Sequence, residues 1–456
     1  MIAMTLAEIA EVVGGTVHGD ASLRITGPAY VDSRRPEPGG LFVAVVGEHV
    51  DGHEYAEHAH AVLGTRATPA PTVMVDDAVT ALGRLARHVV DRVAPLVVAL
   101  TGSQGKTGTK DYLAHVLAEE GGTVATTGNF NNEIGVPLTV LRAGDSTRYL
   151  VVEMGARGVG HVRYLCQLAP PQISGVLNVG TAHLSEFGTR EQIALAKGEI
   201  VEALPPDGTA VLNADDDLVT PMADRTAART LTFGSTGDVS WRDVALDDLG
   251  RPSFDLGYAG AWHPVSLTQS GGHQVANAAA AAAFAIAAGV DPATVAARLS
   301  TAMPASRWRM ELHQRADGLV VVNDAYNANP ASMTAALDAL TQLGSRRSGR
   351  TLAVMGEMLE LGDGAVDAHR EVGQHAARTG VDVLVTVGPN AALIADGAES
   401  VSSWDGRVRR TAGRDEALAW VRENVAADDV VLVKASRGAA LEHVADGLLT
   451  EEETTR

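Results

Sequence analysis

A glycine-rich run that ends in a lysine and a threonine carries the strongest chemical signal of the sequence. Residues 101–107 read Thr-Gly-Ser-Gln-Gly-Lys-Thr and follow a short apolar run, residues 96–100. Glycines let backbone N–H groups approach phosphate oxygens, a lysine neutralises the terminal phosphates, and a threonine hydroxyl can bind Mg²⁺. The spacing is Gly-x-x-Gly-Lys-Thr, because Leu100 stands where the longer P-loop motif has its first glycine. We predict a phosphate site, rather than an ordinary turn, at Gly102, Ser103, Gln104, Gly105, Lys106, Thr107 and Gly108.

Two further polar residues follow predicted strands. Glu153 comes directly after the predicted strand at residues 149–152, and His183 follows the one that ends near Asn178. Ligand groups gather at the carboxyl ends of parallel strands, so both side chains are expected to face the phosphates. Either residue alone is more often structural. Together they predict a metal site.

Lysine is rare in this chain. Of 36 Lys and Arg residues only Lys106, Lys110, Lys197 and Lys434 are lysine. Arginine evidently serves wherever a plain positive charge is enough. These four positions are therefore candidates for chemistry that arginine cannot perform, such as point-charge phosphate binding or the reaction of a neutral amine. Lys197 lies on a predicted helix, residues 191–204, where the alternative is a solvated surface lysine.

Alternating strands and helices must position these residues. Short apolar runs predict parallel strands in three successive blocks, with shorter antiparallel strands over residues 230–270 and an alanine-rich helix over 273–288. We predict an α/β protein with a smaller N-terminal α/β domain (1–94), a central P-loop mononucleotide-binding parallel sheet (95–302) and a C-terminal Rossmann-like domain (303–456). The predicted strands are residues 41–46, 72–75, 96–100, 149–152, 173–178, 210–213, 319–322, 351–355, 383–387 and 430–433.

Composition excludes several classes of protein. A net charge of −20 over 456 residues disfavours nucleic-acid binding, which needs a basic face. The single cysteine, Cys166, cannot form an intramolecular disulfide, and the longest apolar run, residues 278–288, is too short to span a bilayer. Thr5 and Glu8 fit a helix capping box rather than a signal peptide. We expect a cytoplasmic monomer without a membrane span.

Several longer strings carry a resemblance. Residues 323–330 read Asn-Asp-Ala-Tyr-Asn-Ala-Asn-Pro, residues 355–362 read Met-Gly-Glu-Met-Leu-Glu-Leu-Gly, and residues 128–137 read Gly-Asn-Phe-Asn-Asn-Glu-Ile-Gly-Val-Pro. With Asp32-Ser-Arg34, Glu153-Met-Gly and Lys434-Ala-Ser-Arg437, they make the whole chain resemble the Mur ligase family. The first two strings are typical of the branch that adds D-alanyl-D-alanine.

The resemblance implies an acid–D-amino-acid ligase of peptidoglycan precursor synthesis. Its expected substrates are ATP, with Mg²⁺, a UDP-N-acetylmuramoyl-tripeptide that binds the N-terminal domain, and D-alanyl-D-alanine, joined through an acyl phosphate. The alternatives are a related Mur or folylpolyglutamate-type ligase that adds a single amino acid, a P-loop kinase or ATPase, and a nucleotide-binding module without turnover.

The resemblance also implies roles for individual residues. Lys106, Glu153, His183 and Lys197 are the expected catalytic residues, and Thr107, Glu153, His183 and a carbamylated Lys197 the expected metal ligands. Further nucleotide contacts are expected from Asn277, Arg309 and Asp324. The expected substrate-binding residues are Ser33, Arg34, Thr127, Asn129, Asn132, Tyr326, Asn327, Asn329 and Arg437.

Overall fold

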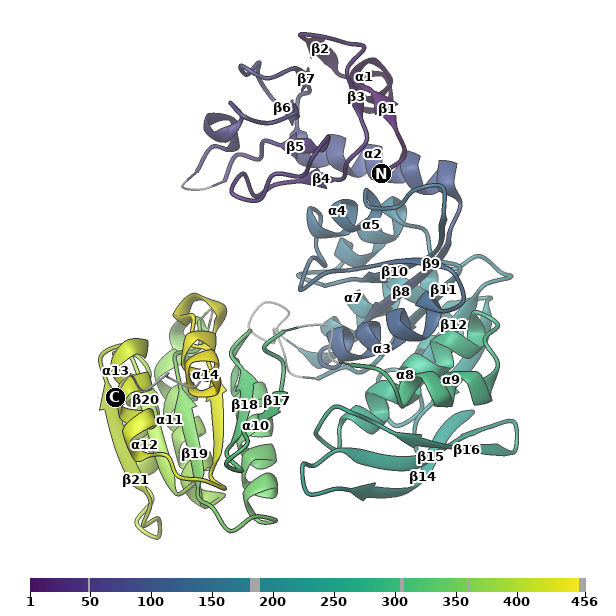
Figure 1. Ribbon diagram of the computed structural model, residues 1–456. Helices are drawn as coiled ribbons and strands as arrows, with labels where there is room; N and C mark the ends of the chain where they lie inside the picture. The colour runs from purple at the N-terminus through teal and green to yellow at the C-terminus, as the bar shows by residue number, and fades with distance from the viewer. Residues whose placement is uncertain (48–49, 181–188, 304–306, 360, 451–456) are drawn as a thin grey trace. The chain divides into compact units, whose positions relative to one another are not determined.

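The structure, a computed structural model, describes residues 1–456 except 48–49, 181–188, 304–306, 360 and 451–456. His183, a predicted site residue, lies outside the described residues. Over these described residues, the chain is an α/β protein with three larger sheets of five, nine and six strands and a two-stranded sheet near the N-terminus (Figure 1). The predicted fold class is therefore confirmed.

The N-terminal region contains the five-stranded sheet, in which β2 is antiparallel to β7 and the other strands are parallel. Its first helix, α1 (Leu6–Val13), begins with the predicted capping box, in which Thr5 and Glu8 each accept a backbone hydrogen bond from the other. Gly14 ends the helix in the left-handed conformation. The remaining elements are β1 (Met4–Thr5), β2 (Thr16–His18), β3 (Arg24–Ile25), β4 (Ala29–Tyr30), β5 (Leu41–Val43), η1 (Gly52–Tyr55), β6 (Ala61–Gly64), β7 (Thr72–Met74) and α2 (Ala78–Val93).

The nine-stranded sheet is parallel from β9 through β10, β8, β11 and β12 to β13, and continues through β14 to β16. Strand β8 (Leu96–Thr101) lies between β10 and β11 and leads into the phosphate-loop segment and then into α3 (Lys106–Ala118). The other strands are β9 (Gly122–Ala125), β10 (Thr147–Glu153), β11 (Ile173–Val176), β12 (Thr209–Asn213), β13 (Arg229–Phe233), β14 (Val239–Leu246), β15 (Pro252–Tyr258) and β16 (Ala261–Ser266). The other helices are α4 (Gly135–Val140), α5 (His161–Leu168), α7 (Arg190–Glu202), η2 (Thr220–Arg225), α8 (Gln274–Ala287) and α9 (Pro292–Leu299).

The six-stranded sheet has the order β17-β18-β22-β19-β20-β21, with β17 antiparallel at one edge and the rest parallel. Its strands are β17 (Glu311–Gln314), β18 (Val320–Asp324), β19 (Thr351–Met355), β20 (Val383–Val387), β21 (Arg407–Thr411) and β22 (Val430–Lys434). The flanking helices are α10 (Pro330–Gly344), η3 (Gly362–Gly364), α11 (Ala365–Arg378), α12 (Ala392–Glu399), α13 (Arg414–Asn424), η4 (Arg437–Ala439) and α14 (Glu442–Leu449).

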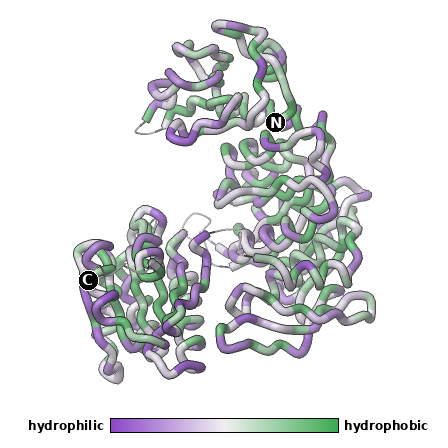
Figure 2. The backbone as a smooth tube through the Cα atoms, viewed as in Figure 1, coloured by the Kyte–Doolittle hydropathy of each residue, from purple (hydrophilic) through white to green (hydrophobic). Residues whose placement is uncertain are grey.

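Successive side chains along these strands point to opposite faces of the six-stranded sheet, so a hydrophobic core forms on each face. Val320 and Val322 pack with residues of α10, α11 and α12, whereas Val321 packs with residues of α13 and α14. Because both faces are covered, the central strands read as continuous apolar runs, which Figure 2 shows as hydrophobic segments.

By compactness the chain forms two units. The first comprises residues 1–242, 255–265 and 275–302, and the second comprises 243–254, 266–274 and 303–456. One hydrophobic core in the first unit runs from Ile2 to Met222, so the three predicted domain ranges stay predictions. Across the described ranges, no helix is both long and apolar enough to cross a membrane.

Candidate active site

The phosphate-loop segment lies between β8 and α3, as predicted. Gly105 begins α3 with a φ of 77° and caps it with no side chain, so the helix presents uncapped backbone N–H groups. The positive φ favours glycine at this position, and a Cβ atom there would lie 2.5 Å from Oδ1 of Asn277, so the Asn277 side chain lies close to the loop. Asn178 fixes the loop, because its Oδ1 accepts the N–H of Gln104 (2.9 Å) and its carbonyl accepts that of Ser103 (3.1 Å).

The Lys106 ammonium curls back over this loop. Its Nζ donates to the carbonyl of Gly102 at 2.6 Å and lies 3.4 Å from that of Ser103. The lysine, the predicted nucleotide contact Asn277 and the N-terminus of α3 therefore meet around one concave backbone segment. That arrangement suits the terminal phosphates of a nucleotide.

Glu153 ends β10 beside the loop and is 2% exposed. Its Oε2 accepts from the Thr107 hydroxyl at 3.0 Å, and its Oε1 accepts from Nδ2 of Asn131 at 2.8 Å. The Glu153 backbone N–H donates to the hydroxyl of Thr126 at 3.0 Å. Two of the predicted metal ligands, Thr107 and Glu153, are thus in direct contact, and both supply the oxygen atoms that hard cations prefer.

Lys197 lies on α7 and is 4% exposed. Burial, together with the nearby charge of Lys106, holds the pKa of this amine well below its ordinary value, against the attraction of Glu153. The amine has no hydrogen bond or ion pair to any residue that the structure describes. A lowered pKa favours the neutral form of the amine, and a neutral amine is a nucleophile.

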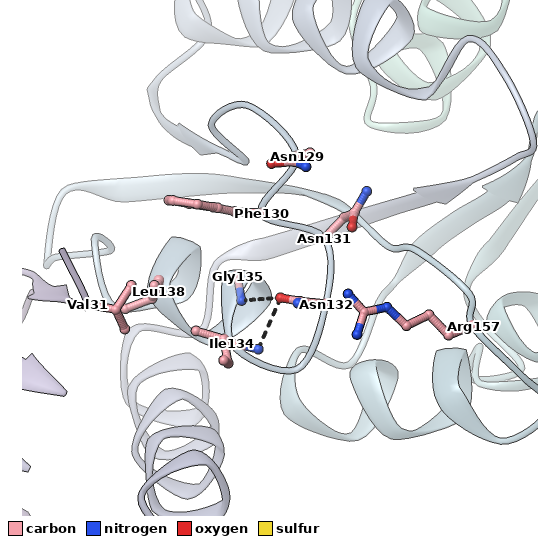
Figure 3. A pocket seen from close by; sticks show the side chains of 9 residues that line it. All are labelled: Val31, Asn129, Phe130, Asn131, Asn132, Ile134, Gly135, Leu138 and Arg157. Carbon is pink, nitrogen blue, oxygen red and sulfur yellow. Dashed lines mark hydrogen bonds between the residues drawn. The ribbon is translucent and has the colours of Figure 1, made fainter. Parts of the chain in front are cut away.

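The segment between β9 and α4 carries three predicted substrate-binding residues. The Thr127 hydroxyl accepts from Nη1 of Arg142 at 2.7 Å, and Oδ1 of Asn132 accepts the Gly135 N–H at 2.8 Å, at the start of α4. Asn129 is exposed. With Asn132 it lines a cavity of about 260 Å³ (Figure 3).

Ser33 and Arg34 follow closely in the sequence after Val31, which also lines this cavity and precedes Ser33 by two residues. Nε and Nη2 of Arg34 donate to the Asp32 carboxylate at 2.8 and 2.9 Å, and this guanidinium is 86% exposed. These two predicted substrate-binding residues thus occupy an open turn that contains the ion pair of Arg34 with Asp32.

The other predicted residues gather within the second unit. Asp324 ends β18, and Lys434 stands opposite it at the end of β22. Nζ of Lys434, a residue 2% exposed, donates to Oδ2 of Asp324 at 2.6 Å and to the carbonyl of Asn327 at 2.8 Å. Oδ1 of Asp324 accepts the Met310 N–H at 3.1 Å. We call Asp324, Asn327 and Lys434 the lysine corner.

Arg437 follows Lys434 by three residues, and Arg309 precedes Met310, whose N–H donates to Asp324. The Arg309 guanidinium stacks on the Tyr326 ring at 4.2 Å, and that of Arg437 stacks on the Trp308 ring at 4.4 Å. Nε of Arg309 is buried without a hydrogen-bond partner in the described part of the chain. Trp308 and Met310 both have positive φ, at 62° and 50°. Unpaired polar atoms and strained backbone are typical of ligand sites.

Asn329 has a structural role that the sequence did not reveal. Its Oδ1 accepts the Ser332 N–H at 2.8 Å while the Ser332 hydroxyl accepts the Asn329 N–H at 3.0 Å, so the pair begins α10. Arg437 likewise donates to Glu442 at 2.6 Å.

Two residues that support the site, Asn131 and Asn178, were not predicted from the sequence, although Asn131 stands inside the 128–137 string. Asn178 had no signal beyond its place after β11. Lys434 was predicted as a rare lysine with a chemical role, but its partners Asp324 and Asn327 were not.

Comparison with known proteins agrees with this geometry. The family model described as Mur ligase middle domain matches residues 100–285, and that described as Mur ligase, glutamate ligase domain, matches residues 308–437. The UDP-N-acetylmuramoyl-tripeptide–D-alanyl-D-alanine ligase of Mycobacterium tuberculosis is 42% identical over 99% of both chains. This chain belongs to the Mur ligase family.

Solved structures of Mur ligases are also similar. One is the UDP-N-acetylmuramoylalanyl-D-glutamyl-2,6-diaminopimelate–D-alanyl-D-alanyl ligase of Acinetobacter baumannii, 30% identical with a TM-score of 0.84 over 98% of this chain and 99% of that one. Another is the MurF ligase of Thermotoga maritima in complex with ADP, 30% identical with a TM-score of 0.76 over 93% and 97%. The predicted family is confirmed.

Proposed function

We propose that this chain is the ATP-dependent ligase that joins D-alanyl-D-alanine to a UDP-N-acetylmuramoyl-tripeptide in peptidoglycan precursor synthesis. One observation carries the proposal: the buried contact of Thr107 with Glu153 stands beside a lysine-tipped phosphate loop, in a chain whose Mycobacterium tuberculosis relative, 42% identical, bears that name. Neither a single-amino-acid ligase nor a kinase is favoured by these relatives.

The reaction needs ATP because a carboxylate is a poor electrophile. Transfer of the γ-phosphoryl group to the terminal carboxylate of the tripeptide gives an acyl phosphate and ADP. The amine of D-alanyl-D-alanine then attacks the acyl carbon, and the tetrahedral intermediate expels phosphate as the amide forms. The protein contributes mainly positioning and charge in such a phosphoryl transfer.

The chain's own residues supply that charge. The N–H groups at the start of α3 and the Lys106 ammonium hold the β- and γ-phosphates. Thr107 and Glu153 fit one Mg²⁺, because their oxygen atoms are buried and adjacent, and Glu153 with His183 and a carbamylated Lys197 would hold a second. Bound Mg²⁺ neutralises charge that develops on the transferring phosphoryl group.

Carbamylation of Lys197 follows from its burial. The neutral amine attacks CO₂, a C–N bond forms, and one proton leaves to solvent. The product is a carbamate whose oxygen atoms suit a hard cation. An arginine cannot undergo this reaction, which accounts for a lysine in an arginine-rich chain.

The remaining residues divide among the three substrates. Asn277, Arg309 and Asp324 bind the nucleotide. Tyr326, Asn327, Asn329 and Arg437 bind the acceptor dipeptide, Asn329 through its side-chain NH₂, since its carbonyl begins α10. Ser33 and Arg34 bind the uridine diphosphate, and Thr127, Asn129 and Asn132 bind the sugar and peptide. The enzyme acts as a cytoplasmic monomer.

Phosphate release across a matrix of UDP-muramoyl peptides and amines tests the proposal. Release should require the tripeptide and D-alanyl-D-alanine together. Carboxylate ¹⁸O should pass from the tripeptide into the released phosphate, because the acyl phosphate retains that oxygen until it is expelled. Phosphate without ¹⁸O, or release with water alone, would identify an ATPase instead.

A further inference from the structure

Arg157 lines the same cavity as Asn131, the residue that donates a hydrogen bond to Glu153. The cavity of about 260 Å³ is bounded by Asn129, Asn132 and Arg157 and by several apolar side chains. Figure 3 shows the guanidinium directed toward Asn132. A positive group in a partly apolar cavity, in a chain of net charge −20, is placed to attract an anion.

The surrounding residues fix Arg157 without consuming its donors. The Arg157 backbone N–H donates to Nδ1 of His161 at 3.2 Å, so Nε2 of that ring carries the proton and donates to Oε2 of Glu133 at 3.0 Å. Nη1 of Arg157 lies 3.8 Å from Oε1 of Glu133, too far for a hydrogen bond. Glu133 therefore orients the guanidinium through charge alone.

Glu133 is itself well satisfied. Burial opposes its ionisation, but its backbone N–H, the hydrogen bond from His161 and the charge of Arg157 together hold the pKa of this carboxyl below its ordinary value. The Arg157 side chain is 67% exposed and makes no hydrogen bond to any described residue. Its planar fork is therefore free to bind a carboxylate through two parallel hydrogen bonds.

The position of the cavity limits which carboxylate can reach it. On one side is Val31, two residues before Ser33; on the other is Asn131, whose Nδ2 donates to Glu153. Under the proposed function this is the path between the uridine end and the phosphoryl-transfer end of the muramoyl substrate. The peptide lies there. The Acinetobacter baumannii ligase is named for a peptide of alanyl, D-glutamyl and 2,6-diaminopimelate residues. Such a peptide keeps one free carboxylate on the glutamyl residue and one on the diaminopimelate, besides the one that reacts.

We infer that Arg157 binds a non-reacting carboxylate of the peptide part of the muramoyl substrate and thereby sets specificity for an acidic peptide. This inference rests on the proposed function. Among the residues that line the cavity, only Arg157 carries a full positive charge to match that carboxylate. Binding of a remote carboxylate also aligns the reacting one beside Glu153.

Steady-state kinetics of Arg157→Ala and Arg157→Lys test the inference, with Arg229→Ala as a matched exposed-arginine control on β13. Three substrates separate the sources: the acidic tripeptide, the same peptide with the free glutamyl carboxylate amidated, and the same peptide with lysine in place of diaminopimelate. For the acidic tripeptide we expect Arg157→Ala to raise KM about 10–100-fold, which is the value of a charge-assisted pair. Arg157→Lys should recover part of that loss, and KM for ATP should not change.

The substrate that lacks the bound carboxylate should bind the wild-type enzyme as weakly as the acidic tripeptide binds Arg157→Ala, and Arg157→Ala should then cost nothing more. An Arg157→Ala effect of equal size on all three peptides, or none on any, overturns the inference. Direct titration of the tripeptide into each variant, with a thermal melt, separates lost binding from lost folding. Absence of wild-type turnover with every peptide would instead contradict the proposed function.

Discussion

Lys197 in the first unit and Lys434 in the second are buried to a similar degree, at 4% and 2% exposure, yet their surroundings differ completely. Lys434 donates to the carboxylate of Asp324 and to a backbone carbonyl. Lys197 has neither kind of partner among the described residues, and its pKa is well below the ordinary value because of burial. A buried lysine with partners stabilises a local arrangement, whereas one without partners is a reactive amine.

Lys110 follows the pattern of Lys434. It is 3% exposed, donates to the carbonyl of Thr126 at 2.8 Å and forms an ion pair with Asp111. Thr126 in turn accepts the Glu153 N–H. The rare lysines of this chain therefore divide into Lys110 and Lys434, which bond to backbone carbonyls and carboxylates, and Lys106 and Lys197, for which we propose roles in the chemistry.

The largest expected effect concerns the residues of the second unit that we propose to bind the acceptor, namely Tyr326, Asn327, Asn329 and Arg437. A site built to hydrogen-bond the amide of a dipeptide leaves polar groups unpaired when a single amino acid binds, so D-alanyl-D-alanine should exceed D-alanine by about 10³ in kcat/KM. Comparison of D-alanine, L-alanine, glutamate and D-alanyl-D-alanine at saturating ATP measures it. Equal use of a single amino acid would move the chain to another branch of its family and would contradict the acceptor roles proposed for these residues.

Lys197→Arg tests the other member of the comparison, the buried lysine without partners. The charge is conserved but the reactive amine is lost, so kcat should fall by about 10², comparable with the loss of one charge-stabilising group. In wild-type enzyme, activity should decline in bicarbonate-free buffer as pH falls, because protonation of the amine prevents carbamylation, and should recover with added bicarbonate. A bare amine at Lys197, shown by mass spectrometry of active enzyme, would refute this role.

Lys434→Met should act on stability. Loss of the amine leaves the Asp324 carboxylate unpaired, and breaking a buried pair costs about 3 kcal/mol in free energy of unfolding. Urea denaturation at neutral pH measures the change, and a double variant with Asp324→Asn should recover part of it. If Lys434→Met were as stable as wild type, the lysine corner would not depend on this ion pair.

The smallest effect is expected from Lys197→Met. The amine has no described partner to lose, so the free energy of unfolding at neutral pH should hold steady or rise. Because the unfolded lysine binds a proton that the folded one does not, wild-type stability should increase with pH between the lowered pKa and that of free lysine. Lys197→Met should remove this slope when melts are compared in bicarbonate-free buffers from pH 7 upward. A persistent slope would assign it to another group.

Much of the fold was predictable because it is encoded locally. The capping box at Thr5 and Glu8 gave α1, and apolar runs gave β8, β19 and β20 within a residue or two. The edge strand β21 (Arg407–Thr411) was not predicted, since three of its five residues are arginine and only one is buried. Edge strands bury too little to need an apolar run.

The site was predictable only as far as single strand ends reveal it. Thr107 and Glu153 were placed together because parallel strands share one carboxyl edge. The pairing of Lys434 with Asp324 was not, because it depends on which strands become neighbours in the sheet. The partners lie 110 residues apart and meet through the β18–β22 register, which no local pattern specifies.

The β18–β22 register constrains the order in which the strands of the second unit can pair during synthesis. Strand β22 lies between β18 and β19, although both precede it in the chain. During synthesis, β18 and β19 emerge before β22, which pairs with both of them. The lysine corner cannot form until β22 has left the ribosome and has paired with these two strands. The lysine corner therefore forms only after residues 430–434 have paired with residues 320–324 in the sheet.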